Sequence, residues 1–244
     1  KAIALKEKPY LIIAGYTAYP RKVDWKKFRE IADVCGALLL CDMSHLSGLV
    51  AGGAYPAPFA YADVVTTTTH KTLRGPRSAL IFSKIDTRNL PAKIDKAVFP
   101  GIQGGPHMNQ IAAVAVALKE AAEPKFKTYA KQIIVNAKAF AKALQKHGWR
   151  IVTGGTDSHL LLVDTWMSGK GLPGDAASVV LEKEGIVVNK NTIPGETRSP
   201  MDPSGLRLGT AAETTRGFKE KDFEKLAARI DSILRKEIAR LQKA

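Results

Sequence analysis

An acid and an amine stand at places in the sequence where a ligand could meet both of them. Asp42 follows the apolar run Leu38–Cys41, and Lys71 follows Val64–Val65 and the polar run Thr66–His70. In open α/β sheets ligands bind outside the carboxyl ends of the strands, so polar residues at these ends are the first candidates for a site. If the two strands are neighbours, the carboxylate and the amine lie about one strand spacing apart, and a flat ring fits between them.

An aldehyde cofactor requires this pair of groups. Lys71 can condense with the aldehyde as an imine, and Asp42 can hold a proton on a ring nitrogen so that the ring accepts electrons. The ordinary interpretation stays open, because most lysines are solvated and an aspartate at a strand end usually caps a turn or a helix. His45 and His70 add modestly to the hypothesis, and the threonines between 66 and 69 are also good strand formers.

The first half of the chain has the strand, helix, strand order of an α/β layer. The run Ala37–Cys41 lacks alternation, which is typical of a parallel strand covered on both faces. Apolar patterns predict strands at Tyr10–Ala14, Ala37–Cys41, Ala62–Val65 and Ala79–Phe82, and a helix over Trp25–Cys35.

The second half mixes helices with short strands and predicts a small α+β domain. We expect the division near residue 120, with residues 1–120 forming part of a large α/β domain and residues 121–244 the small domain. Helices are predicted at 109–122, 126–144, 175–184 and 218–241, and strands at 150–153, 159–164, 186–188 and 206–208.

Composition excludes several classes of protein. The 244 residues are 45% hydrophobic and 25% charged, as in a packed globular protein. The net charge of +14 is spread along amphipathic segments, so we attribute it to helix surfaces and to attraction for small anions, and expect no nucleic-acid partner. We find no membrane-spanning run or signal peptide and expect a cytoplasmic protein. Cys35 and Cys41 have no metal-site spacing, so no metal is expected.

Several motifs, taken together and in order, resemble the serine hydroxymethyltransferase family. The resemblance covers essentially the whole chain, and such an ordered set is far more specific than a single glycine-rich loop. The motifs are CDMSHLSGLVAG at 41–52, VVTTTTHKTLRGPR at 64–77, QGGP at 103–106, GGTDSHL at 154–160, NKNT at 189–192 and SGLRLGT at 204–210.

The resemblance implies the fold of the fold-type I, aspartate-aminotransferase-like enzymes that depend on pyridoxal phosphate. Residues 1–120 would then be part of the large cofactor-binding domain. The implied activity is that of a glycine hydroxymethyltransferase in one-carbon metabolism. It converts serine and tetrahydrofolate reversibly to glycine and 5,10-methylenetetrahydrofolate.

The resemblance also assigns residues to the cofactor. Lys71 would form the imine with pyridoxal phosphate, Asp42 would pair with the pyridinium nitrogen, and His45 would contact the ring. Thr17 stands where the family usually has a small hydroxyl residue near the cofactor. Gly104–Gly105 would approach the cofactor phosphate of a neighbouring subunit through exposed backbone N–H groups, which implies a homodimer with shared sites.

Further roles follow from the same motifs. Thr68 and His70 would flank the lysine and tune its exchange with the substrate amine, and Arg77 would support the site electrostatically. Arg207 would bind the substrate carboxylate, for which a guanidinium is a bidentate partner, and Asn191 would lie near the folate.

Each of these residues also has an ordinary interpretation, and the chain departs from the family in places. Gly104–Gly105 could be a turn, and either arginine could be a loop or surface cation. Ser78–Ala79 stands where a glycine pair is expected, Asn109 where a histidine is expected, and Ala211 replaces the usual proline. None of these changes removes a proposed catalytic group.

Family members begin well before this chain. Their earlier part brings the serine-rich phosphate loop, the ring-stacking histidine, and the glutamate and tyrosine that act on the substrate. We therefore expect a truncated chain, a split enzyme whose amino-terminal half is a separate chain, or an incompletely recorded sequence, with weak cofactor binding and poor turnover by itself.

Two alternatives to the hydroxymethyltransferase remain. One is a threonine or β-hydroxy amino acid aldolase, whose activity would not depend on folate. The other is a non-catalytic half-subunit that lends Gly104–Gly105 to a complete partner, although the intact Asp42, Lys71 and Arg207 argue against it.

Overall fold

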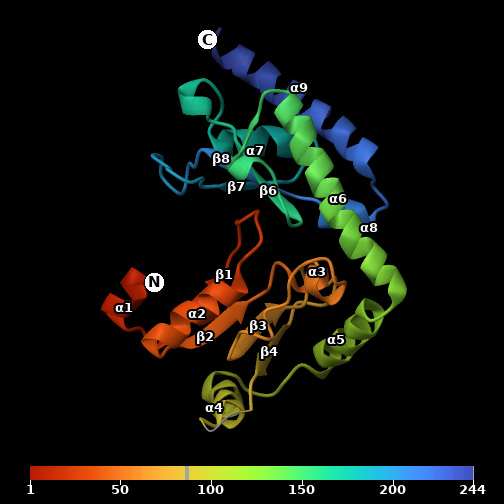
Figure 1. Cartoon of the computed structure of the whole chain (residues 1–244). Helices are drawn as coiled ribbons and strands as arrows, with labels where there is room; N and C mark the ends of the chain where they lie inside the picture. Colours follow the sequence, from red (N-terminus) through yellow and green to blue (C-terminus); the bar gives the residue numbers. More distant parts are fainter. Residues whose placement is uncertain (86–87, 244) are drawn as a thin grey trace. The chain divides into compact units, whose positions relative to one another are not determined.

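The computed structural model describes residues 1–85 and 88–243 (Figure 1). The chain forms two compact units, the first made of residues 1–17 and 23–128 and the second of residues 18–22 and 129–244. The sequence pattern predicts a division near residue 120, whereas compactness divides the chain between Thr128 and Tyr129. This point lies inside helix α6 (Pro124–Lys146), which continues from one unit into the other.

The first unit is built on a four-stranded sheet in the order β1-β2-β3-β4, and it confirms the predicted α/β class. The first three strands are parallel and β4 is antiparallel to β3, so the sheet is mixed rather than fully parallel. The short link from β3 to β4 contains no crossover helix, and such links join antiparallel strands. The strands are β1 (Leu11–Gly15), β2 (Leu38–Asp42), β3 (Val64–Thr68) and β4 (Ala79–Ser83).

Helix α2 (Trp25–Cys35) joins β1 to β2 and has the predicted bounds. It begins at Asp24, whose carboxylate accepts the Lys27 backbone N–H at 3.0 Å, and it ends at Gly36 in the left-handed conformation. The other helices of this unit are α1 (Ala2–Glu7), α3 (Ser47–Ala51), α4 (Leu90–Lys96) and α5 (Met108–Ala121).

The second unit is a four-stranded antiparallel sheet in the order β5-β6-β8-β7 with helices packed on it, as an α+β domain requires. Its strands are β5 (Arg150–Ile151), β6 (Leu160–Asp164), β7 (Asn189–Asn191) and β8 (Gly205–Gly209). Its helices, besides most of α6, are α7 (Gly174–Lys183), α8 (Ala211–Thr215) and α9 (Glu220–Leu241).

The strand predicted at 186–188 is wrong, since β7 begins at Asn189. The Ile186 N–H instead bonds to the Leu181 carbonyl at 2.9 Å, a contact that closes the end of α7. Ile186 and Val188 pack against the core while Val187 is 81% exposed. The apolar alternation is therefore real, but it belongs to a helix-terminating loop.

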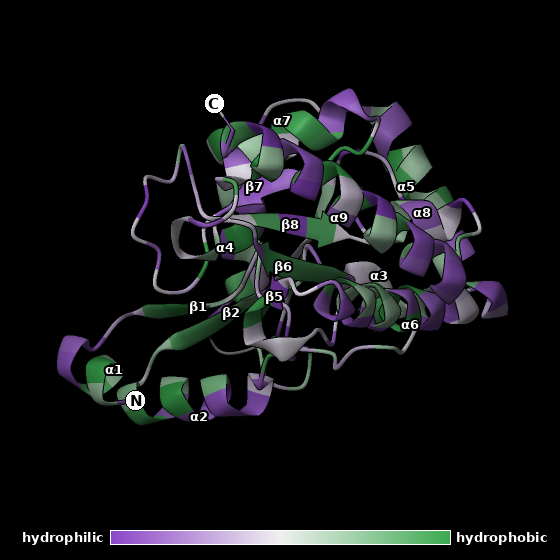
Figure 2. Cartoon of the chain, turned by 90° about the horizontal axis from the view of Figure 1, so that it is seen from above, coloured by the Kyte–Doolittle hydropathy of each residue, from purple (hydrophilic) through white to green (hydrophobic). Residues whose placement is uncertain are grey.

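The core of the second unit places Arg207. Leu206 and Leu208 of β8 pack in the cluster that contains Phe140 of α6 and Phe223 of α9. Because strand side chains alternate, Arg207 lies on the opposite face of the sheet. Figure 2 shows β6 and β2 mainly in the hydrophobic colour, while α6 and α9 carry both colours, as helices with one buried face do.

Candidate active site

Asp42 and Lys71 follow two neighbouring parallel strands of the first unit. Asp42 is the last residue of β2 and lies opposite Thr66 of β3, and Lys71 comes three residues after the end of β3. Both line one open pocket of about 410 Å³. Thr17 and His45 line the same pocket, so four of the predicted residues come together, and the remaining lining residues are Gly15, Tyr16 and Ser44.

The Asp42 carboxylate is held by two neutral donors. One oxygen accepts the Ser44 backbone N–H at 2.8 Å, and the other accepts the Thr66 hydroxyl at 2.8 Å. These bonds fix the plane of the carboxylate without adding a positive charge to it. Its negative charge therefore stays available to a ligand in the pocket.

Lys71 is tied to the same network through Thr68. The Lys71 Nζ donates to Thr68 Oγ1 at 2.9 Å, and the Thr68 backbone N–H donates to Ser44 Oγ at 3.0 Å. Ser44 thus links the aspartate to the residue that holds the lysine. Sequence reasoning missed Ser44 and Thr66, although the period of two in β3 places Thr66 on the same face as Thr68 and could have identified it.

Thr72 fixes the loop of His45 against the turn that carries Lys71. Its hydroxyl donates to the His45 carbonyl at 3.1 Å and accepts the Gly48 N–H at 3.0 Å. A Cβ on residue 48 would lie 2.1 Å from the Thr72 carbonyl oxygen, so only glycine permits this approach. Gly48 is therefore needed for the position of His45 beside the lysine.

His70 lies near the positive charges of Lys71 and Arg77. Burial, followed by the positive charges of Lys71 and Arg77, lowers the pKa of the imidazole, so His70 is neutral at pH 7. Within the described chain its buried Nδ1 has no hydrogen-bond partner. A neutral ring with a free nitrogen can accept a proton or a hydrogen bond.

Arg77 and the glycine pair meet at a second pocket of the first unit. This pocket has a volume of about 530 Å³ and is lined by Arg77, Gly104, Gly105 and Gln110, among others. Lys71 and Asp42 are not part of its lining. The structure therefore divides the predicted cofactor residues of this unit between two pockets.

Arg207 and Asn191 are both in the second unit. Arg207 lies opposite Leu162 and Asn189 in the sheet, and its Nη2 donates to the Asn189 side-chain oxygen at 3.0 Å. Burial lowers the pKa of the Arg207 guanidinium. Asn191 pairs with Gly205 and its side-chain amide donates to the Thr192 carbonyl at 2.6 Å.

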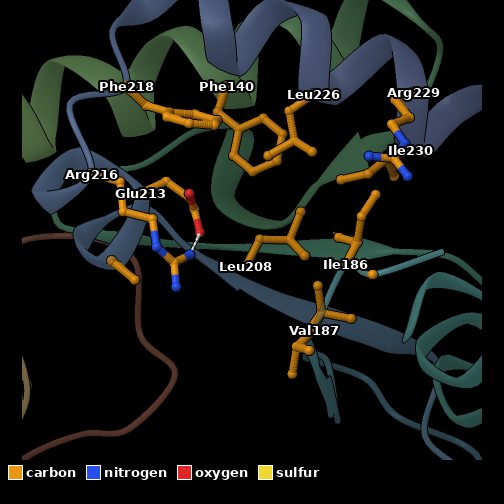
Figure 3. Close-up of a pocket in the computed structure, with 14 residues that line it drawn as sticks. Phe140, Ile186, Val187, Leu208, Glu213, Arg216, Phe218, Leu226, Arg229 and Ile230 are labelled. Atoms are coloured by element: carbon orange, nitrogen blue, oxygen red, sulfur yellow. Dashed lines mark hydrogen bonds and ion pairs between the residues drawn. The ribbon is translucent and has the colours of Figure 1, made fainter. Parts of the chain in front are cut away.

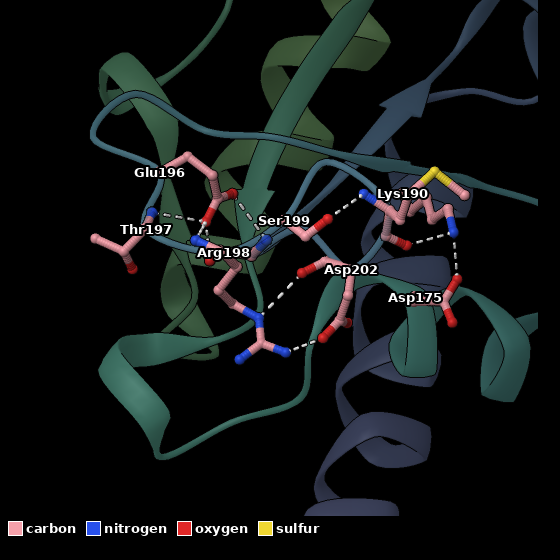
Figure 4. A network of polar contacts seen from close by, with 9 residues as sticks. Asp175, Lys190, Glu196, Thr197, Arg198, Ser199 and Asp202 are labelled. Carbon is pink, nitrogen blue, oxygen red and sulfur yellow. Dashed lines mark hydrogen bonds and ion pairs between the residues drawn. The ribbon is translucent and has the colours of Figure 1, made fainter.

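A second acidic centre, absent from the sequence interpretation, organises the loop between β7 and β8 (Figure 4). The Glu196 carboxylate accepts the Ser204 hydroxyl at 2.6 Å and the backbone N–H groups of Ser204 and Arg198 at 2.9 and 3.0 Å. Burial opposes its charge, but these donors lower the pKa of Glu196 to about 2. The sequence carries no signal for it beyond a loop composition.

The cations of this loop and of the adjoining strand β7 are paired within the unit. Arg198 forms an ion pair with Asp202 and lies over the Trp166 ring at 4.1 Å, and the Lys190 Nζ lies 2.6 Å from Asp175. These charges are neutralised by neighbours, so the loop is a structural network rather than a ligand site.

Over residues 1–85 and 88–243, no group of three or more His, Cys, Asp or Glu side chains could hold a metal ion. No helix in those residues is both long enough and apolar enough to cross a bilayer. Cys35 and Cys41 are free thiols, and burial raises the pKa of Cys41 to about 11.

Comparison with known proteins gives one family. The sequence model of serine hydroxymethyltransferase matches residues 1–230. The serine hydroxymethyltransferases of Wolbachia pipientis subsp. Culex pipiens (strain wPip) and Legionella pneumophila (strain Lens) are each 54% identical to this chain over 232 residues. A probable serine hydroxymethyltransferase of Mesomycoplasma hyopneumoniae (strain J) is 54% identical over 234 residues.

The matches cover 95–96% of this chain but 54–55% of each of these relatives. The chain therefore spans about half the length of the curated relatives it matches. The matched span contains the two pockets described above and also Arg207 and Asn191, and the fold-type I architecture predicted above is that of the matching family. With its strand-end acid and amine in the expected order and half of its residues identical to these relatives, the chain belongs to the serine hydroxymethyltransferase family.

Proposed function

We propose that the enzyme to which this chain belongs transfers a hydroxymethyl group between serine and tetrahydrofolate, with pyridoxal phosphate as cofactor. The products are glycine and 5,10-methylenetetrahydrofolate. The observation that carries the proposal is the shared pocket of Asp42 and Lys71 at the ends of β2 and β3. An ionised carboxylate and a primary amine in one open pocket fit a pyridine aldehyde.

Asp42 would hold a proton at the ring nitrogen of the cofactor. The Thr66 hydroxyl and the Ser44 N–H occupy two of the roughly four acceptor positions of a carboxylate, which leaves the others for this proton. Thr17 and His45 line the same pocket and would contact the ring. When bound, pyridoxal phosphate supplies an electron-withdrawing ring that weakens a bond at the substrate Cα.

Lys71 would be the point of covalent attachment. Thr68 accepts a hydrogen bond from its amine and so orients it, and neutral His70 adds no third positive charge beside Lys71 and Arg77. In this assignment Thr68 and His70 tune the release of the lysine from the cofactor. Arg77 adds positive charge near the anionic cofactor.

Arg207 would bind the serine carboxylate, and Asn191 would lie near the folate. Support for Arg207 comes from its position on the sheet face away from the helices. A guanidinium can bind a carboxylate through two parallel hydrogen bonds.

We further propose a cytoplasmic homodimer with shared sites, or the complementary half of the enzyme as a separate chain. The exposed Gly104–Gly105 loop lines a pocket apart from Lys71, as a residue pair that serves a neighbouring subunit would. Both cysteines are unpaired, which is usual in a reducing compartment. Sedimentation of the chain with and without the complementary half tests the assembly.

The first test is covalent labelling. The purified chain is mixed with pyridoxal phosphate, reduced with borohydride and digested, and the modified peptide is identified by mass spectrometry. We expect a single adduct on Lys71. Adducts scattered over surface lysines, with the complementary half present as well as absent, would overturn the proposal.

The second test separates the transferase from an aldolase. Conversion of serine to glycine is measured on the assembled enzyme with and without tetrahydrofolate. The proposal expects turnover that requires tetrahydrofolate. Cleavage of β-hydroxy amino acids at a rate indifferent to folate would favour the aldolase.

A further inference from the structure

The second unit contains a pocket that none of the proposed catalytic residues lines. It lies between strand β8, the short helix α8 and helix α9, and the loop at residues 185–188 forms one side (Figure 3). Its volume is about 350 Å³, within the roughly 300–1,000 Å³ of small-molecule sites.

Small residues leave this space open. A Cβ on Gly185 would have no atom within 4 Å, and a Cβ on Gly209 would meet only a carbonyl oxygen at 4.0 Å. Ala212 of α8 adds a third short side chain to the wall. Three of the lining positions therefore add little bulk to the wall of the pocket.

Much of the wall is formed by apolar side chains. Phe140, Leu208, Leu226 and Ile230 come from α6, β8 and α9, and Figure 3 shows their side chains on opposite sides of the space. Val187, at the rim, is 81% exposed. Covering such surface with a hydrocarbon group is favourable by about 25 cal/mol per Å² of apolar area removed from water.

The charged groups of the pocket differ in their partners. Arg216 forms an ion pair with Glu213, so these two charges cancel. Arg229 donates to the Glu184 backbone carbonyl at 2.7 Å, which is a neutral acceptor. Within residues 1–85 and 88–243 no carboxylate is paired with Arg229, so its charge is open to an anion at the side of the pocket nearest Ile186.

We propose that this pocket binds a small monocarboxylate with a rigid apolar body, the carboxylate pairing with Arg229. The positive charge of Arg229 would repel a cationic ligand. A ligand with two anionic groups would place its second anion near Glu213, whose carboxylate already pairs with Arg216. The site uses none of the residues assigned to serine, folate or pyridoxal phosphate, so it stands independently of the proposed function.

The test uses 2-naphthoate, a two-ring carboxylate, and 2-naphthalenemethanol, its neutral analogue. Binding to the whole chain is measured by isothermal titration calorimetry at low and at moderate salt. We expect saturable binding of 2-naphthoate, weaker binding of the alcohol, and a loss of affinity with salt for the carboxylate alone.

Two variants and one control make the test specific. Arg229→Leu should weaken 2-naphthoate at least about fivefold and leave the alcohol unchanged, because it removes one charge-assisted contact. Ala212→Phe should abolish binding of both probes by filling the pocket, and Ala212 is exposed enough to accept the ring. Lys236→Met, two turns further along α9, removes the same charge outside the pocket and should change neither affinity.

The proposal is overturned if 2-naphthoate shows no saturable binding, or if Arg229→Leu and Lys236→Met weaken it equally. It is also overturned if Ala212→Phe leaves both affinities intact, since binding then occurs elsewhere. Circular dichroism of each variant confirms that a lost affinity does not reflect unfolding.

Discussion

The Asp42 carboxylate of the first unit and the Glu196 carboxylate of the second unit are used in opposite ways. Asp42 accepts two hydrogen bonds, from the Ser44 N–H and the Thr66 hydroxyl, and faces an open pocket. Glu196 accepts the Ser204 hydroxyl and N–H and the N–H groups of Ile193, Thr197 and Arg198. A carboxylate has about four acceptor positions. Asp42 therefore keeps acceptor positions for a ligand, while donors of its own loop fill those of Glu196.

Both carboxylates belong to hydrogen-bond networks, but the two networks leave different amounts of charge for a ligand. In the first unit the donors are few and neutral, and the charge remains for binding. In the second unit the loop cations already have carboxylate partners, Arg198 with Asp202 and Lys190 with Asp175. For a charged side chain, the useful question is thus how many of its hydrogen-bonding positions its own chain leaves unfilled.

The largest expected effect removes the amine at the open pocket. Lys71→Ala should eliminate the specific borohydride-trapped adduct of pyridoxal phosphate, because among the described residues Lys71 alone brings a primary amine to that pocket. Peptide mapping by mass spectrometry checks this. Lys93→Ala, an exposed lysine of α4, should leave the labelling unchanged. Equal labelling of the Lys71→Ala chain would show that the pocket does not select the lysine.

The next effect concerns the donor that orients Asp42. Thr66→Val removes the hydroxyl at 2.8 Å from the carboxylate, a bond worth about 1.5–3 kcal/mol because its acceptor is charged. We expect the pyridoxal phosphate concentration for half-maximal labelling of Lys71 to rise about tenfold or more.

Thr67→Val is the matched control for this change. Thr67 is the next residue of β3, is 3% exposed, and donates to the Thr68 carbonyl at 3.0 Å rather than to Asp42. It should leave the half-maximal concentration unchanged, and Thr66→Ser should restore it. If both valine variants shift it alike, the effect is one of strand packing and the contrast between the two carboxylates fails.

A smaller effect is expected at the filled carboxylate. Glu196→Gln should lower the free energy of unfolding at pH 7 by about 1–2 kcal/mol, a figure reduced for solvent screening of a partly exposed group. The pKa of Glu196 is about 2 in the folded chain and 4.5 ordinarily, so its contribution is present above pH 4.5 and is lost as the pH falls toward 2. Urea unfolding between pH 3 and 7 should show a shallower pH slope in the variant. A parallel slope would contradict the assignment.

The elements that the sequence predicted well are those with strong local signals. Helix α2 has a capping aspartate, an amphipathic run and a closing glycine, and its bounds agree with the prediction. The strand predicted at 186–188 failed because Ile186 closes α7 through a bond to Leu181, five residues earlier. Periodicity shows that alternate residues are buried, but it does not reveal which backbone partner an N–H finds.

The sequence predicted those residues of the candidate site that stand at or just after the end of a strand. Asp42 and Lys71 were found from their place after apolar runs, and the structure puts them in one pocket. Ser44, Thr66 and Glu196 were missed, because their importance lies in which carboxylate or N–H they contact. Such pairings depend on register and loop closure, which residue types alone do not specify.

The smallest effect is expected for a charge pair that belongs to neither kind of network. Arg240 pairs with Glu237 on the exposed side of α9, and hydrogen bonding to Arg240 lowers the pKa of Glu237. Arg240→Ala should leave the thermal midpoint within error, because exposed pairs gain little over hydration. Asp231→Ala on the same helix should lower the midpoint measurably, since the indole N–H of buried Trp149 would lose its acceptor at 2.8 Å. Equal losses in differential scanning calorimetry would mean that the exposed ion pair contributes as much to stability as the acceptor of the buried indole N–H, which would contradict this prediction.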